Sequence, residues 1–164
     1  MNKEESIVMT KELIGRAYLC ACVHGFHETE LSVEHMLMLV LSEIGEAVEA
    51  DRKCRHAYIE SYEDEIRYGA YVYDKDTRSP FEKYIKDTVE DELADVCIRL
   101  YDMCGALGIE PRVEYDDMGT DFVDIFGDDS FCERMYYLSR LLCSTSGVVE
   151  DDGTDDCLPQ VVGQ

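Results

Sequence analysis

The sequence predicts an all-α protein, an antiparallel helical bundle with a four-helix core. Two observations point to this class. Long stretches of the chain repeat apolar residues at the three- and four-residue spacing of an amphipathic helix. Two of them begin with a capping box, Ser79-Pro80-Phe81-Glu82 and Ser130-Phe131-Cys132-Glu133. Helices of this kind bury their apolar stripes against one another.

The first two predicted helices span residues 8–25 and about 33–54. In the first, the apolar stripe consists of Leu13, Ile14, Ala17, Tyr18 and Ala21. Ser32 is the expected N-cap of the second helix, and Glu34 is favourably placed in its first turn.

The third predicted helix runs from the Ser79 capping box to about Leu107, and Gly108 is a suitable residue to end it. The fourth runs from the Ser130 capping box to about residue 144. Its apolar stripe consists of Phe131, Met135, Leu138, Leu141 and Leu142.

The segments between these helices differ in character. Residues 56–78 are rich in tyrosine, and we expect a short helix or an irregular arm that serves as a subunit interface or a lid; an unspecific surface loop is the alternative. Residues 110–129 predict an acidic loop. Residues 147–164 are an acidic tail that we expect to be disordered, so that residues 1–146 form the single domain.

Composition limits the possible functions. The formal charge of −22 and the pI near 4.3 argue against binding to a nucleic-acid backbone. No apolar run is long enough to span a membrane, and the N-terminus lacks the apolar core of a signal peptide. We therefore expect a cytoplasmic protein with reduced cysteines, among which Cys97 and Cys104 share the buried face of the third helix.

Two acid pairs are the strongest chemical signal. Glu43 and Glu46 lie three positions apart, about 60° on a helix, with Glu43 inside the apolar arc and Glu46 at its edge. Glu92 and Asp95 repeat this arrangement on the third helix. The apolar residues expected around Glu92 are Ile85, Val89, Val96, Leu100 and Met103.

A carboxylate that faces a core is costly unless a cation or hydrogen bonds compensate it. Four carboxylates without His or Cys suit a hard divalent cation, so we expect Mg²⁺, with Mn²⁺ as the second possibility. The alternative is that these are ordinary solvated helix acids, which are common in so acidic a chain.

These motifs resemble those of the all-α nucleoside triphosphate pyrophosphohydrolases, the superfamily of MazG-like proteins, dimeric dUTPases and dCTP pyrophosphatases. The resemblance covers about residues 10–110. It rests on the two acid pairs and on the words around them, Leu41-Ser42-Glu43-Ile44-Gly45-Glu46-Ala47 and Asp91-Glu92-Leu93-Ala94-Asp95-Val96. The tyrosine-rich insertion makes the connection between the pairs longer than is usual in small members.

The resemblance implies hydrolysis of a nucleoside triphosphate between the α and β phosphates, which yields a monophosphate and pyrophosphate. It implies a magnesium site on Glu43, Glu46, Glu92 and Asp95, where Glu46, with Glu43 as the other catalytic residue, orients the attacking water. It also implies a homodimer or tetramer. The stripe on residues 131–142 and the tyrosine-rich arm, which have few partners within one copy, favour such association as well.

Five further residues are weaker candidates for substrate binding. Lys53 and Arg55 follow the second helix, where a triphosphate held by the metal could reach them; stabilisation of the helix end explains them equally well. Arg99 either neutralises the acid cluster, the favoured interpretation, or contacts phosphate. His24 and His27, with Phe26 between them, could border the base.

Two other classes of protein are alternatives to a pyrophosphohydrolase. A di-iron bundle requires Glu-x-x-His pairs, which the four histidines are not placed to supply. A non-enzymatic acidic protein that mimics nucleic acid and binds a basic partner is the stronger alternative. It would spread its carboxylates over the exterior, whereas an enzyme needs a concentrated, partly buried set.

Overall fold

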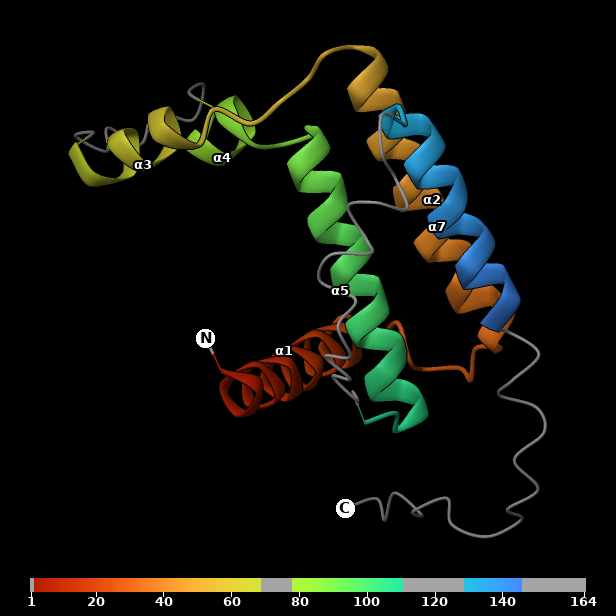
Figure 1. Cartoon of the computed structure of the whole chain (residues 1–164). Coiled ribbons are helices and arrows are strands. Elements are labelled where there is room, and N and C mark those ends of the chain that lie inside the picture. The colour runs from red at the N-terminus through yellow and green to blue at the C-terminus, as the bar shows by residue number, and fades with distance from the viewer. Residues whose placement is uncertain (1, 69–77, 111–128, 146–164) are drawn as a thin grey trace, which may run out of the picture.

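The computed structural model describes residues 2–68, 78–110 and 129–145, and there every regular element is a helix (Figure 1). The helices are α1 (Lys3–Val23), α2 (Val33–Arg52), α3 (Ile59–Tyr68), α4 (Pro80–Tyr84), α5 (Val89–Leu107) and α7 (Phe131–Thr145). The all-α class is therefore confirmed. None of the described helices is both long enough and apolar enough to cross a membrane. The predicted acidic loop, apart from its end residues, and the acidic tail lie outside the described residues.

Polar N-caps begin the helices much as the sequence predicts. The Ser32 hydroxyl accepts a hydrogen bond from the backbone N–H of His35 at 3.2 Å. Ser130 and Glu133 exchange the two hydrogen bonds of a capping box at the start of α7. The first helix begins earlier than residue 8, because Asn2 and Glu5 form a further capping box.

The prediction of one continuous helix over residues 79–107 is wrong. The Ser79 capping box begins only the short α4, and the chain leaves the helical conformation before Val89. Asp87 adopts a positive φ of 58°, and the Thr88 hydroxyl accepts a hydrogen bond from the N–H of Asp91, which starts α5. Ile85 consequently does not share a helix with Glu92.

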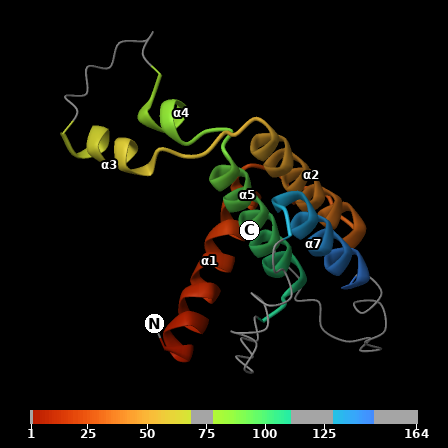
Figure 2. The same ribbon diagram turned by 45° about the horizontal axis from the view of Figure 1, so that its top comes forward.

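Helix α5 lies at the centre of the packed part of the molecule. It contacts both α1 and α2, and α7 packs against α2 (Figures 1 and 2). Figure 1 shows that α2 and α5 run in opposite directions. Between them lie the buried Val40, Ile44 and Val96, against which Met135, Leu138 and Leu142 of α7 and other side chains pack. The four-helix bundle and its completion by a second copy stay predictions.

A glycine sets the crossing of α1 with α5. A Cβ added at Gly105 would lie only 2.5 Å from the Cβ of Tyr18, so no larger residue fits without separation of the helices. Because α1 meets this C-terminal half of α5, Cys104 is half-buried while Cys97 is exposed. The prediction that both cysteines share a buried face is therefore wrong. Leu141 is likewise exposed, because α7 turns only part of its stripe toward α2.

Helices α3 and α4 form an arm that stands apart from the other helices in both views (Figures 1 and 2). They are joined to each other by a hydrogen bond from the N–H of Tyr58 to the carbonyl of Tyr84 and by the Lys83–Glu65 ion pair. The short helix expected within residues 56–78 is thus present as α3; residues 69–77 lie outside the described part. The large apolar side chains that the arm exposes are Tyr58, Ile59, Ile66, Tyr68 and Phe81.

Candidate metal centre

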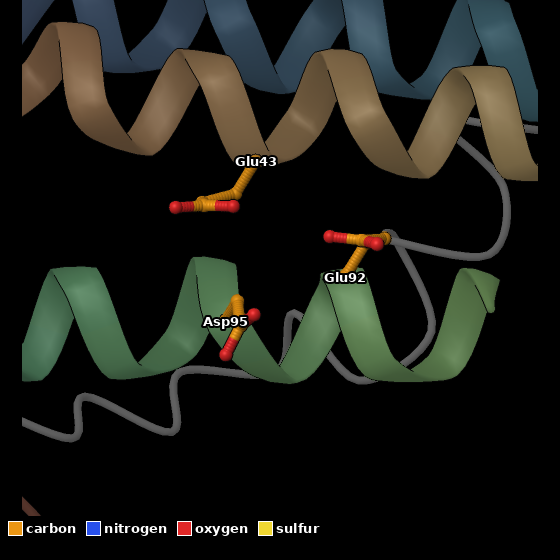
Figure 3. Close-up of side chains that lie close together, drawn as sticks. All are labelled: Glu43, Glu92 and Asp95. Carbon is orange, nitrogen blue, oxygen red and sulfur yellow. The ribbon is translucent and has the colours of Figure 1, made fainter. Parts of the chain in front are cut away.

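Helices α2 and α5 bring three carboxylates together. Glu43 lies beside the core residue Ile44 on α2 and points toward α5, while Glu92 on α5 points toward α2 (Figure 3). Asp95 follows one turn later on α5. One carboxylate oxygen from each of these acids lies within 4.8 Å of the others. The predicted approach of Glu43 and Glu92 is confirmed, and we call Glu43, Glu92 and Asp95 the acid cluster.

Glu92 is the unusual member of the acid cluster. It is only 7% exposed, yet its carboxylate has no hydrogen bond or ion pair with any described residue. Within the described residues no fully buried side-chain oxygen or nitrogen lacks a partner, so the oxygens of Glu92 still touch solvent. The side chain is therefore buried along its length but open at its charged end, where a cation could enter.

The pKa values reflect this excess of negative charge. Burial, followed by the charge of Glu46 and then those of the other nearby acids, raises the pKa of Glu92 to about 7. Burial and the charges of Asp91 and Glu43 likewise raise the pKa of Asp95, against the opposing effect of Arg99. Without metal, Glu92 is thus partly protonated near neutral pH.

Arg99 neutralises only part of the cluster. Its Nε donates a hydrogen bond to Oε1 of Glu43 at 3.1 Å, and the two side chains are 31% and 12% exposed. The guanidinium carbon lies 5.7 Å from the centroid of the Phe26 ring. This geometry favours the interpretation that Arg99 neutralises the acids over the one in which it contacts phosphate.

Glu46, the fourth acid of the predicted site, is exposed and lies outside the acid cluster. Its charge nevertheless raises the pKa of Glu92 more than that of any other single residue does. Asp91, which the sequence analysis did not include, also raises the pKa of both α5 acids. The available signal was the four-residue spacing of Asp91 and Asp95, which places the two acids on neighbouring turns of one helix face.

The basic side chains at and after the end of α2 form contacts with nearby residues of the chain. Arg52 and Lys53 form ion pairs with Glu49, each at 2.9 Å. Arg55 lies 3.5 Å from the carbonyl oxygen of Asp87, at the turn into α5. Stabilisation of the helix end thus accounts for Lys53. A role of Lys53 and Arg55 in substrate binding stays a prediction.

The histidines after α1 lie beside α5. His27 Nε2 donates a hydrogen bond to Oδ1 of Asp102 at 2.7 Å, while His24 Nδ1 donates to the carbonyl of Cys20 at 2.8 Å. Here a surface pocket of about 100 Å³ opens. Its lining residues are Ala17, Cys20, Ala21, His24, Phe26, Ile98, Arg99 and Asp102. Asp102 was missed in the sequence, although it lies one turn beyond Arg99 on the same face.

Comparisons with known proteins add no assignment: no family model, no curated protein and no solved structure matches this chain.

The residues present fit a hard divalent cation. The cluster offers oxygen donors alone, which is the set that Mg²⁺ and Mn²⁺ prefer over softer ligands. One negative charge is already balanced by Arg99, while Glu92 and Asp95 carry raised pKa values that a bound cation would lower.

Proposed function

We propose that this protein is a Mg²⁺-dependent nucleoside triphosphate pyrophosphohydrolase, which cleaves an NTP or dNTP between the α and β phosphates to a monophosphate and pyrophosphate. The observation that carries the proposal is the Glu92 side chain, which is only 7% exposed, has no hydrogen bond or ion pair among the described residues and lies close to Glu43 and Asp95. A protein gains little from such a costly arrangement unless a ligand compensates it. The type of reaction is inferred from the resemblance of the two acid pairs to those of the all-α pyrophosphohydrolases.

In this proposal the four acids divide between cation binding and catalysis. Glu43, Glu92 and Asp95 hold Mg²⁺, or Mn²⁺ in its place. The bound ion supplies charge neutralisation for the phosphate oxygens and a lower pKa for a coordinated water. Glu46, which is exposed and has no ion pair with any described residue, orients the attacking water and accepts its proton, with Glu43 as the other catalytic residue. Burial of the Glu92 side chain and partial burial of Asp95 reduce the screening of these charges by bulk water.

The small pocket beside Arg99 is the proposed place for part of the nucleoside. Phe26 offers an exposed ring face, and His24 lies at the rim. A pocket of about 100 Å³ is smaller than the roughly 300–1,000 Å³ of a typical small-molecule site. We infer that a second copy of the chain completes the site in a homodimer or tetramer, as the exposed apolar residues of the arm also favour.

The test is incubation of the protein with a panel of ribo- and deoxyribonucleoside triphosphates and Mg²⁺, with assay of pyrophosphate and monophosphate. The expected result is pyrophosphate release that EDTA abolishes and that Mn²⁺ restores. Release of inorganic phosphate alone, or no turnover of any triphosphate by the oligomeric protein, would contradict the proposal.

The acidic mimic of nucleic acid is the second function under consideration, because a charge of −22 suits a basic partner surface. The burial of Glu92 argues against it, since a mimic needs its carboxylates exposed. A stable complex with a basic nucleic-acid-binding protein that added DNA displaces, together with no pyrophosphatase activity, would favour the mimic.

A further inference from the structure

A side-chain hydrogen bond connects the turn after α1 directly to α5. The hydrogen bond between His27 and Asp102 is short, at 2.7 Å, and each side chain is only 15% exposed. The ring of Tyr18 packs against the His27 ring, with the centroids 5.1 Å apart. Two independent contacts therefore fix where the residues that neighbour His27 lie.

Phe26 precedes His27, and this fixed turn places its ring by the Arg99 guanidinium. Arg99 and Asp102 are three positions apart on α5, so the turn contacts two side chains on one face of the same helix. Phe26 is 55% exposed, so its ring contributes little to the core. Its contact with Arg99 is its most specific interaction.

Arg99 has two acids within reach. It bonds to Glu43 across the helix pair, while Asp95 lies four positions earlier on its own helix, the usual spacing of an intrahelical ion pair. Arg99 lowers the pKa of Asp95 through its charge but makes no hydrogen bond to it. If Arg99 turned to Asp95, it would occupy the space between the carboxylates and release Glu43.

We propose that Phe26, held by the His27–Asp102 bond, is a positioning residue for the metal centre: it keeps Arg99 on Glu43, so that the carboxylates of Glu43, Glu92 and Asp95 remain turned toward a common cation. This inference rests on the proposed function in that the ligand is a divalent cation. It assigns to the turn at residues 24–27 a role in cation affinity that is separate from any contact with substrate.

The test measures Mg²⁺ binding by calorimetry, without nucleotide. Phe26→Ala is expected to weaken Mg²⁺ binding about two- to fivefold, the effect of losing one exposed cation–π contact. His27→Ala, which keeps the Phe26 ring but frees the turn, is expected to weaken it to a similar extent. In an Arg99→Gln background Phe26→Ala should have no further effect, because the two act as one unit.

Tyr136→Ala is the matched control. Tyr136 is similarly exposed and its ring centroid lies 5.9 Å from the guanidinium carbon of Arg140, but it is on α7, which contributes no residue to the acid cluster. This variant should bind Mg²⁺ as the wild type does. Helical circular dichroism checks that each variant folds, and Asp102→Asn replaces His27→Ala if that variant unfolds.

A second readout does not depend on Mg²⁺. The Nε–H resonance of Arg99 in nuclear magnetic resonance spectra should be distinct in the wild type, because it is hydrogen-bonded and lies near an aromatic ring. Phe26→Ala and His27→Ala should shift it, and Tyr136→Ala should not. An unchanged Mg²⁺ affinity in Phe26→Ala overturns the positioning role while the metal centre stands, whereas no Mg²⁺ binding by the wild type overturns both.

Discussion

The region where α2 packs on α5, which we call the seam, and the α3–α4 arm are both rich in acids. The surroundings of these acids shift their pKa values in opposite directions in the two regions. In the arm, Glu65 pairs with Lys83 at 2.9 Å and Glu82 accepts hydrogen bonds from Ser79, and both contacts lower the pKa of the acid. In the seam, burial and neighbouring carboxylates raise the pKa values of Glu92 and Asp95. In the arm, Glu65 and Glu82 thus have partners within the chain, whereas Glu92 in the seam has none among the described residues.

The two regions differ in apolar surface as well. The seam buries Val40, Ile44 and Val96, while the arm leaves tyrosines and isoleucines exposed. The seam thus combines a buried apolar core with acids that lack partners among the described residues, whereas the arm exposes its apolar side chains. Each part of this difference can be tested by matched substitutions.

The largest expected effect is on catalysis. Glu92→Gln should lower pyrophosphate release about 1,000-fold, since the loss of a metal ligand removes several kcal/mol of transition-state stabilisation. Glu65→Gln, in the arm, should leave activity near that of the wild type. Equal activities of the two variants would show that the seam and the arm do not differ in function.

The next effect is on stability without metal as a function of pH. Glu92 holds its proton up to a pH of about 7 in the folded protein and releases it near 4.5 in the unfolded chain. Its contribution to the free energy of unfolding, about 3 kcal/mol at most, is therefore fully present below pH 4.5 and is lost as the pH rises through 7. Urea unfolding at several pH values should show this loss in wild type and not in Glu92→Gln.

Glu65→Gln is again the control, and it should keep the Glu92-dependent loss of stability between pH 4.5 and 7. Identical pH profiles for wild type and Glu92→Gln would contradict the raised pKa of Glu92 and, with it, the excess charge of the seam.

A smaller effect concerns the helix that supports the seam. Gly105→Ala should lower the free energy of unfolding by about 2 kcal/mol, because the added Cβ overlaps Tyr18 and separates α1 from α5. At Gly15, also inside a helix, the added Cβ would meet nothing within 4 Å. Gly15→Ala should instead raise stability by about 0.5–1 kcal/mol. Equal effects of the two substitutions would refute the close crossing at Gly105.

The smallest effect on stability is expected in the arm. Replacement of the exposed Tyr58 and Tyr68 by Ser should change the free energy of unfolding by less than about 0.5 kcal/mol. The same variant should associate less strongly than the wild type, which we expect to be a dimer or larger. Light scattering in moderate salt, which screens the charge of −22, measures this association. A fully active wild-type monomer at tens of micromolar would contradict the predicted oligomer.

The fold class and the acid cluster could be predicted from the sequence because both depend on local periodicity. The spacing of Glu43 and Glu92 relative to apolar neighbours placed each on an inner helix face, and the structure brings them together. The break before Val89 was missed because the apolar pattern continues across it. Its signal was Thr88 followed three residues later by Asp91, a second capping sequence inside the presumed helix.

Contacts between distant segments could not be predicted in the same way. The hydrogen bonds from Arg99 to Glu43 and from His27 to Asp102 depend on how helices cross, and periodicity on one helix does not give that crossing. The exposure of Cys97 has the same origin, since the burial of a residue on α5 depends on where the neighbouring helices cross it.

The central claim, that the acid cluster binds a divalent cation, is tested most directly by the position of bound Mn²⁺. Mn²⁺ broadens the nuclear magnetic resonance signals of nuclei near it, and Mg²⁺ should compete for the same site. We predict broadening centred on Glu43, Glu92 and Asp95 at substoichiometric Mn²⁺, reversed by excess Mg²⁺ and absent in Glu92→Gln. Broadening spread evenly over the acidic surface, and unchanged in Glu92→Gln, would contradict the claim.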